Sequence, residues 1–283
     1  MSRLPLHNSA QFSDIGIVLR RIDSNGDGIA QISYAHQDDY YIFGILESGS
    51  GCGVIDLMEH HITAGDIFIV QPGQVHRFID SENAEGWLLF ADSKHVGNIE
   101  KCIFDRFSLF ASSFKIDTTR ESELTQIAAI LADRMSGNLD DKLSRITATR
   151  LTETFISIIA EAIQSIDMQY LRFSQRHIDL VLRLRHLLAE HLASSRQPSY
   201  YASRLNISTV YLNEVVKKVT GMNSTIFIKN EVVLRAKRML VHSHLSIKEI
   251  SIKLGFDDSA YFSRMFTSST GISPTSFRQK YLE

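Results

Sequence analysis

The sequence predicts a multi-domain α+β protein, with a β-barrel and a helical pair first and an all-α domain at the C-terminus. Short, turn-punctuated segments rich in β-branched and aromatic residues fill residues 15–115, whereas helical periodicity replaces them from residue 121 onward. The charge also divides along the chain. Residues 175–283 hold 16 Lys and Arg against 8 Asp and Glu, whereas residues 1–174 hold 14 against 24. A basic part joined to an acidic part indicates that only one of them meets a polyanion.

Four segments of the first part are expected to be strands. They are YYIFGIL (40–46), GVIDL (53–57), DIFIV (66–70) and WLLF (87–90). The segments SGSGCG, HITAGD and QPGQVH lie between them and supply the Gly and Pro of tight turns. Short strands at a spacing of about ten residues favour a small barrel or sandwich. Because no helix follows SGSGCG, a hairpin turn is expected there rather than a phosphate-binding loop.

Two amphipathic helices are expected after the barrel, separated by the polar segment SGNLDD (136–141). Their apolar stripes are Leu124, Ile127, Ala128 and Leu131 in the first, and Leu151, Phe155, Ile158, Ile159 and Ala162 in the second. The pair either covers one face of the barrel or dimerises, and the sequence leaves both open. The expected domains are a barrel over 1–118, the helical pair over 119–166, a linker over 167–176 and the C-terminal domain over 177–283.

The C-terminal domain is expected to be entirely helical, with helices near 176–193, 198–205, 208–219, 224–242, 246–254, 258–268 and 274–281. Near its end, Ser246 and Glu249 have the spacing of a capping box, and Gly255 falls where a helix ends in a left-handed turn. Asp258 or Ser259 then starts a second short helix, whose inward residues are Phe262, Met265 and Phe266. A short helix, a turn and a second short helix with a small polar face are typical of a major-groove reader.

The same pattern occurs about fifty residues earlier. Tyr201 to Leu205 form a short helix, Asn206-Ile207 is the turn, and Ser208 caps a second helix. The residues of that helix expected to face mostly inward are Val210, Leu212, Val215, Val216 and Val219. Gly221 closes this unit as Gly271 closes the other. An internal repeat of this size predicts two helix-turn-helix units, joined by a helix near 224–242 that Arg235, Lys237 and Arg238 make basic.

The segment from about 198 to 281 resembles the AraC/XylS family of bacterial transcription regulators. The residues that carry the resemblance are Ala202, Leu205, Ser208, Leu212, Lys217, Gly221, the stretch Ala236-Lys237-Arg238-Met239-Leu240, Ile250, Leu254-Gly255-Phe256, Tyr261-Phe262-Ser263-Arg264, Phe266, Gly271, Ser273-Pro274 and Phe277-Arg278. The resemblance implies two units on one rigid linker helix. They would read neighbouring major-groove segments of a double-stranded DNA operator, about one helical turn (~34 Å) apart.

Position within the motif assigns the residues expected to contact DNA. The base readers are Thr209, Val210, Asn213 and Glu214 in the first unit, and Ser259, Ala260, Ser263 and Arg264 in the second; Ser208 and Tyr261 complete the two surfaces. Arg264 is the strongest candidate, because a guanidinium holds guanine O6 and N7 with two hydrogen bonds. Glu214 either accepts from a cytosine amino group or pairs with Lys218 one turn later. Lys217 and Lys218 are expected to touch phosphate.

The N-terminal part resembles the cupin-like sensing domain of many members of this family, which implies a jelly-roll barrel. Gly49, Gly51, Gly65-Asp66, Pro72-Gly73 and His76 match the second half of the cupin pattern. The stretch where metal-binding cupins carry a histidine pair has none, and adjacent His60 and His61 would point to opposite faces of a strand. We therefore expect no metal and no cofactor. The residues expected to line a pocket for a small, partly apolar or sugar-like effector are Tyr41, Phe43, His76, Phe78 and Trp87, with Trp87 either a sugar-stacking residue or a core aromatic.

The expected function is ligand-responsive regulation of transcription by a homodimer in the bacterial cytoplasm, at the nucleoid, with RNA polymerase as a partner if it activates. No apolar run approaches the ~18 residues of a transmembrane helix, so no membrane association is expected, and no secretory signal is visible. Cys52 and Cys102 are read as unreactive thiols of a reducing compartment.

Two alternatives stay open beside this non-enzymatic reading. One is a cupin-type enzyme, an isomerase or oxygenase, with an accessory DNA-binding module; a stoichiometric bound metal would favour it. The other is a non-specific architectural DNA binder, for which all duplexes would bind equally with one steep salt dependence.

Overall fold

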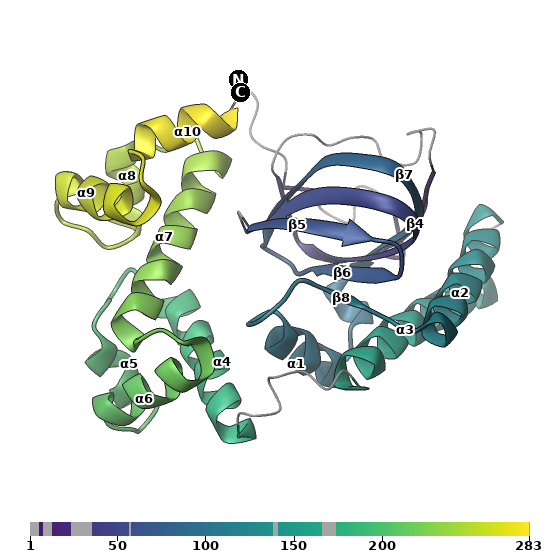
Figure 1. The fold of residues 1–283 in the computed structure, drawn as a ribbon, viewed down its shortest axis with the longest axis horizontal. Coiled ribbons are helices and arrows are strands. Elements are labelled where there is room, and N and C mark those ends of the chain that lie inside the picture. The colour runs from purple at the N-terminus through teal and green to yellow at the C-terminus, as the bar shows by residue number, and fades with distance from the viewer. Residues whose placement is uncertain are drawn as a thin grey trace. The chain divides into compact units, whose positions relative to one another are not determined.

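The computed structural model describes residues 6–7, 13–23, 36–56, 58–137, 141–165 and 174–282 (Figure 1). Contacts divide the chain into two compact units, with the boundary between Asp167 and Met168. Most of the linker expected at 167–176 lies outside the described residues. Among the described helices, none combines the length and the apolar composition that crossing a bilayer requires.

The first unit contains one eight-stranded sheet in the order β1-β3-β7-β4-β6-β8, with β2 beside β7 and β5 beside β4. The strands are β1 (Leu6–His7), β2 (Ile17–Ile22), β3 (His36–Asp38), β4 (Tyr40–Ile55), β5 (Met58–Thr63), β6 (Asp66–Val70), β7 (Val75–Asp92) and β8 (Ser113–Lys115). The turns at Gly65 (φ 81°) and Gly73 (φ 80°) lie where the sequence predicts them.

Two long strands, β4 and β7, form the centre of this sheet and pair antiparallel from Tyr40↔Asp92 to Ile55↔His76. On its other edge, β4 pairs first with β6 and then with β5, so the strand changes neighbours halfway along and the sheet curls (Figure 1). The expected hairpin turn at SGSGCG was wrong, because these residues lie inside β4. Register shifts between Leu46 and Gly53 absorb the irregularity as bulges, which bend and twist a strand without ending it.

Gly49 lies in this bulged region with φ of 72°, a left-handed conformation that favours glycine. A Cβ at this position would lie 2.1 Å from the backbone carbonyl oxygen of Asn83, so no side chain fits without movement of β7. Glycine here therefore permits the close approach of the two long strands at the bend.

The curled sheet has an inner and an outer face, because successive side chains on a strand alternate. Ile42, Leu46, Phe68 and Leu88 belong to the inner core cluster. On the outer face, Phe104 packs against Tyr41 and Phe43, with the Phe43 and Phe104 ring centres 5.4 Å apart. Phe104 lies on α1 (Asn98–Phe107), a helix that the sequence analysis did not predict.

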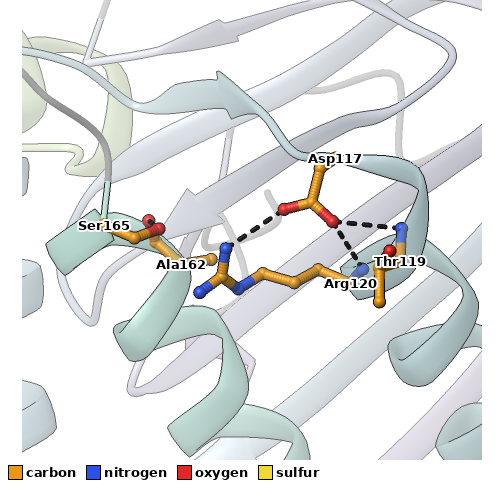
Figure 2. A network of polar contacts seen from close by, with 5 residues as sticks. All are labelled: Asp117, Thr119, Arg120, Ala162 and Ser165. Carbon is orange, nitrogen blue, oxygen red and sulfur yellow. Dashed lines mark hydrogen bonds and ion pairs between the residues drawn. The ribbon is translucent and has the colours of Figure 1, made fainter.

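Two longer helices complete the first unit, α2 (Thr118–Ser136) and α3 (Lys142–Ser165), which pack against each other. Asp117 caps α2: its carboxylate accepts from the backbone N–H of Thr119 and Arg120 at 3.0 Å and from the Arg120 guanidinium at 3.1 Å (Figure 2). These bonds, the Arg120 N–H first, lower the pKa of Asp117. Helix α2 also contacts β2 and β7, which favours the first of the two arrangements that the sequence leaves open, in which the pair covers a face of the barrel.

The second unit is helical throughout its described residues. Its helices are α4 (Gln175–His191), α5 (Pro198–Arg204), α6 (Thr209–Thr220), α7 (Ser224–His242), α8 (Ile247–Lys253), α9 (Ser259–Thr270) and α10 (Pro274–Leu282). Each begins and ends within two residues of its expected position. Helix α7 runs between the α5–α6 pair and the α8–α9 pair, as Figure 1 shows in green and yellow.

Gly49→Ala is expected to lower the free energy of unfolding of the barrel by more than about 2 kcal/mol. The left-handed backbone alone costs a residue with a Cβ about 1–2 kcal/mol, and the contact with Asn83 adds to it. Gly73→Ala is the matched control, because Gly73 has a similar φ and nothing within 4 Å of its added Cβ. Urea titration followed by fluorescence of Trp87, the single tryptophan, reports the barrel alone. Equal losses for the two variants would contradict the steric argument.

Candidate functional site

The turns of the two helix-turn-helix units have the same backbone geometry. Asn206 follows α5 with φ of 54°, and Gly255 follows α8 with φ of 77°. The next N–H in each unit closes the turn: Ile207 donates to the Ala202 carbonyl (3.0 Å), and Phe256 donates to the Ser251 carbonyl (2.8 Å). This is the Schellman pattern of a helix C-terminus. The internal repeat seen in the sequence is thus repeated in hydrogen bonds.

The two outward helices of the repeat, α6 and α9, start and stop by the same devices. The Ser208 hydroxyl accepts from the Tyr211 N–H at 3.1 Å, and the Asp258 carboxylate accepts from the Ala260 N–H at 2.8 Å. Gly221 and Gly271 end them in left-handed conformation. Because each cap fixes the first turn, the residues just after it are presented in a defined orientation.

Helix α6 has a buried face of Leu212, Val215, Val216 and Val219 and an exposed face of Thr209, Val210, Glu214, Lys217 and Lys218. Val210 is 69% exposed, so its expected mostly inward orientation was wrong, and it lies with the proposed base readers instead. Within the described residues, Glu214 forms no ion pair with Lys218.

Asn213 carries a structural hydrogen-bond pair on the flank of α6. Its side-chain oxygen accepts from the backbone N–H of Ser224 at 3.0 Å and from the Ser224 hydroxyl at 3.1 Å. Ser224 is the first residue of α7 and is buried. Asn213 therefore holds α6 to the start of the linker helix, and only its amide nitrogen is left for the base contact that the sequence predicts.

Helix α9 packs through Phe262 and Phe266, both fully buried, and exposes Ala260, Tyr261 and Arg264. The Arg264 side chain is 70% exposed and lies 3.7 Å from the Asp258 carboxylate. Ser259 and Ser263 are half-buried, and the Ser263 hydroxyl donates to the Ser259 carbonyl at 2.8 Å. Of the residues predicted on this helix, Arg264 is the longest polar side chain facing outward.

Three of the arginines in the positive charge of this unit form hydrogen bonds within the unit itself. Arg196 donates to the Leu254 carbonyl at 2.9 Å, and its guanidinium lies 3.9 Å from the Phe256 ring centre. Arg235 donates to the Ala189 carbonyl at 2.5 Å, and Arg278 donates to two carbonyls at the end of α7 and just beyond. Burial lowers the pKa of Arg235 and of Arg278. No sequence pattern indicated that these arginines bind backbone carbonyls or stack on an aromatic ring.

The first unit has a partly open cavity of about 50 Å³ on the inner side of its sheet. Its lining is mostly aliphatic and aromatic, and His76 and Phe78 of the predicted pocket belong to it. The other three predicted residues do not: Tyr41 and Phe43 face α1, and Trp87 also lies outside the lining. The five residues alternate between the two faces of β4 and β7, and the sequence pattern alone does not show which residues share a face.

Trp87 is covered by an arginine. The Arg21 guanidinium lies 4.9 Å from the Trp87 ring centre and pairs with the carboxylates of Glu47 at 2.6 Å and Glu85 at 3.8 Å. A ring face already occupied by a guanidinium is not free to stack on a sugar. The arginine contact does not favour the sugar-stacking reading of Trp87, whose side chain is half-buried.

A buried polar pair lies at one end of the cavity. His76 Nε2 is 3.3 Å from Asp38 Oδ2, and both side chains are almost fully buried. Burial raises the pKa of Asp38 to about 7, although a hydrogen bond with Tyr40 opposes the shift. His76 thus has a carboxyl partner that no sequence pattern indicated, because Asp38 precedes the first expected strand.

Two helix-turn-helix units with outward helices in one unit, and a barrel with a mostly apolar cavity in the other, define a DNA-binding regulator with a sensing domain. Two family models match the chain: an AraC-like ligand binding domain over residues 26–145 and a helix-turn-helix domain over residues 201–280. The chain is 27% identical over 259 residues to the Msm operon regulatory protein of Streptococcus mutans, covering 86% of this chain and 85% of that protein.

Two further relatives are named as transcriptional activators. The transcriptional activator RhaS of Escherichia coli is 22% identical over 86% of this chain and 87% of its own, and RhaR of Cronobacter sakazakii is 34% identical over 29% of each chain. Among solved structures, ToxT from Vibrio cholerae is 11% identical, with 93% of this chain and 97% of that chain covered and a TM-score of 0.47. The chain is an AraC-family transcription regulator, with a ligand-binding domain and a DNA-binding helix-turn-helix domain.

Arg196→Ala is expected to lower the free energy of unfolding of the DNA-binding domain by about 2–3 kcal/mol, because a charge-assisted hydrogen bond and a stacked cation are lost together. Arg183→Ala removes the same charge from an exposed position on α4 and should change stability by less than about 0.5 kcal/mol. Hydrogen–deuterium exchange of the backbone amides of residues 247–256 measures the loss of stability in both variants. Similar exchange in the two variants would show that Arg196 does not hold this segment.

Proposed function

We propose that α6 and α9 read neighbouring major-groove segments of one operator, and that Arg264 makes the main base-specifying contact. The observation that carries this proposal is the 70% exposure of Arg264 on a helix that Phe262 and Phe266 hold rigidly from behind. A guanidinium in that position suits guanine O6 and N7. Its pairing with Asp258 is solvent-exposed, and such pairs contribute only about 0–1 kcal/mol.

The first unit reads DNA differently, through Thr209, Val210 and Glu214. An exposed valine suits the methyl group of thymine, and a carboxylate without a lysine partner suits the amino group of cytosine. Lys217 and Lys218, exposed one turn further along α6, contact phosphate and fix the position of the helix without specifying sequence.

The protein acts as a homodimer and, like the relatives whose names describe them as activators, raises transcription through contact with RNA polymerase. Exposed apolar side chains on the helical pair support dimerisation there: Ile130 is 49% exposed and Leu143 is 71% exposed. Two chains would then place their recognition helices on successive half-sites, as symmetric DNA-binding dimers do.

The effector is a small, mainly apolar molecule in the barrel cavity. A sugar needs many precisely placed polar partners, whereas the surface of this cavity is mainly apolar, although His60, His76, Arg77, Asp80 and Ser81 also belong to its lining. The cavity of about 50 Å³ is also far below the ~300–1,000 Å³ of sites for drug-sized ligands. A compact apolar effector therefore fits better than a sugar.

Arg264→Ala is expected to weaken binding to the selected operator by about 1–3 kcal/mol and to relax the base preference at one position. The operator is first obtained by selection from random duplexes, and titrations then compare it with single-base variants and with random DNA. The same titrations also give the stoichiometry of the complex, which should be two protein chains per operator duplex.

Lys217→Ala is the matched control for this experiment, because it should weaken all duplexes alike and reduce the salt slope by about one. If Arg264→Ala behaves in the same uniform way, Arg264 contacts only phosphate, and the proposed base readout is wrong.

Ala84→Leu is expected to abolish the response to the effector, because Ala84 is buried in the cavity lining and the larger side chain fills the space. The measurement is the ligand-induced rise in melting temperature across a panel of small apolar acids, alcohols and aldehydes beside monosaccharides. Tyr41→Phe, on the outer face, should respond as the wild type does. A preserved response in Ala84→Leu, or a response to monosaccharides alone, would contradict the apolar-effector proposal.

A further inference from the structure

Three metal-ligating side chains meet on the β4–β5 hairpin. In the register of these strands Cys52 lies opposite His61, and Val54 lies opposite Glu59. Because side chains alternate along a strand, Glu59 and His61 share one face of β5, and His60 between them belongs to the cavity lining on the other. The hairpin thus brings a thiol, a carboxylate and an imidazole together from two strands.

Their ligand atoms already have the spacing of a coordination sphere. Cys52 Sγ is 3.4 Å from Glu59 Oε1, His61 Nε2 is 3.5 Å from the same oxygen, and all three atoms lie within 4.8 Å of one another. Zinc bonds of about 2.0 Å to nitrogen or oxygen and 2.3 Å to sulfur place tetrahedral ligands roughly 3.3–3.8 Å apart. Two of the three separations therefore match a tetrahedral site before any side chain moves.

The charge around Cys52 also favours a cation. Asp80 on β7 is the register partner of Cys52 on its other side, so the thiol lies between acidic residues of both neighbouring strands. A divalent ion would offset these negative charges and take up the thiolate as the proton leaves.

We propose that Cys52, Glu59 and His61 form a binding site for a divalent transition-metal ion of the zinc type. One thiolate, one imidazole and one carboxylate are a donor set that suits zinc, whereas magnesium and calcium prefer oxygen ligands alone. Glu59 and His61 are exposed, so water completes the tetrahedron from the solvent side. The site is separate from the position that the cupin pattern uses, and it does not depend on the proposed effector.

Metal at this site would join the two strands of one wall of the cavity. His60 and Ile62 of β5 and Cys52, Val54 and Ile55 of β4 belong to the cavity lining. A crosslink through Cys52 therefore restricts this wall of the cavity directly.

The test uses the full-length, metal-stripped protein and Zn²⁺ alone, titrated by calorimetry against a competing chelator. Wild type should bind one equivalent, and Cys52→Ser and His61→Ala should each weaken binding at least about tenfold. Substituting Co²⁺ for Zn²⁺ should give a thiolate-to-cobalt absorption band in wild type that Cys52→Ser lacks. Trp87 fluorescence checks that each variant is folded.

The chain offers matched controls for the thiol and the imidazole ligand. Cys102→Ser changes the exposed thiol on α1, and His60→Ala changes the neighbouring histidine on the opposite face. Both should bind Zn²⁺ as the wild type does. The proposal is overturned if wild type takes up no stoichiometric Zn²⁺, if folded Cys52→Ser binds it equally well, or if the controls lose binding as the ligand variants do.

Discussion

The pairing of β4 with β7 along almost the whole length of both strands is the constraint on which the ligand-binding domain depends. Since each strand exchanges its other neighbour halfway along, this pairing curls the sheet and creates an inner and an outer face. The inner face encloses the apolar cavity, and the outer face receives Phe104 of α1. The alternation of side chains along these strands decides which residues can meet a ligand, and a shift by one residue would exchange the two faces.

Much of the helical domain could be predicted from the sequence, because its signals are local. Capping residues such as Ser246 and Asp258 and the left-handed Gly255 act within a few residues of their own position, so the helix bounds follow closely. The barrel is different. SGSGCG has the composition of a turn, yet pairing with β7 keeps it extended, and tertiary pairing overrides local preference in strands.

The predictions of functional residues also differ between local signals and contacts of distant segments. Apart from Val210, the exposed positions of α6 and α9 follow from helical periodicity, which identifies Arg264 as exposed. Contacts between distant segments had no such signal: Asp38 beside His76, Arg21 over Trp87, and Cys52 beside His61 depend on strand register or on the curl of the sheet. The net positive charge of the C-terminal domain likewise predicts a basic surface. Arg196, Arg235 and Arg278, however, direct their guanidinium groups to backbone carbonyls within the fold.

Asp258 has two roles at the start of α9. It caps the helix through the Ala260 N–H, and its second oxygen lies 3.7 Å from the Arg264 guanidinium. Because both side chains of this pair are exposed, the pairing holds Arg264 only weakly. In the proposed base readout, the carboxylate is therefore a neighbour that the arginine gives up at little cost when a guanine offers its two acceptors.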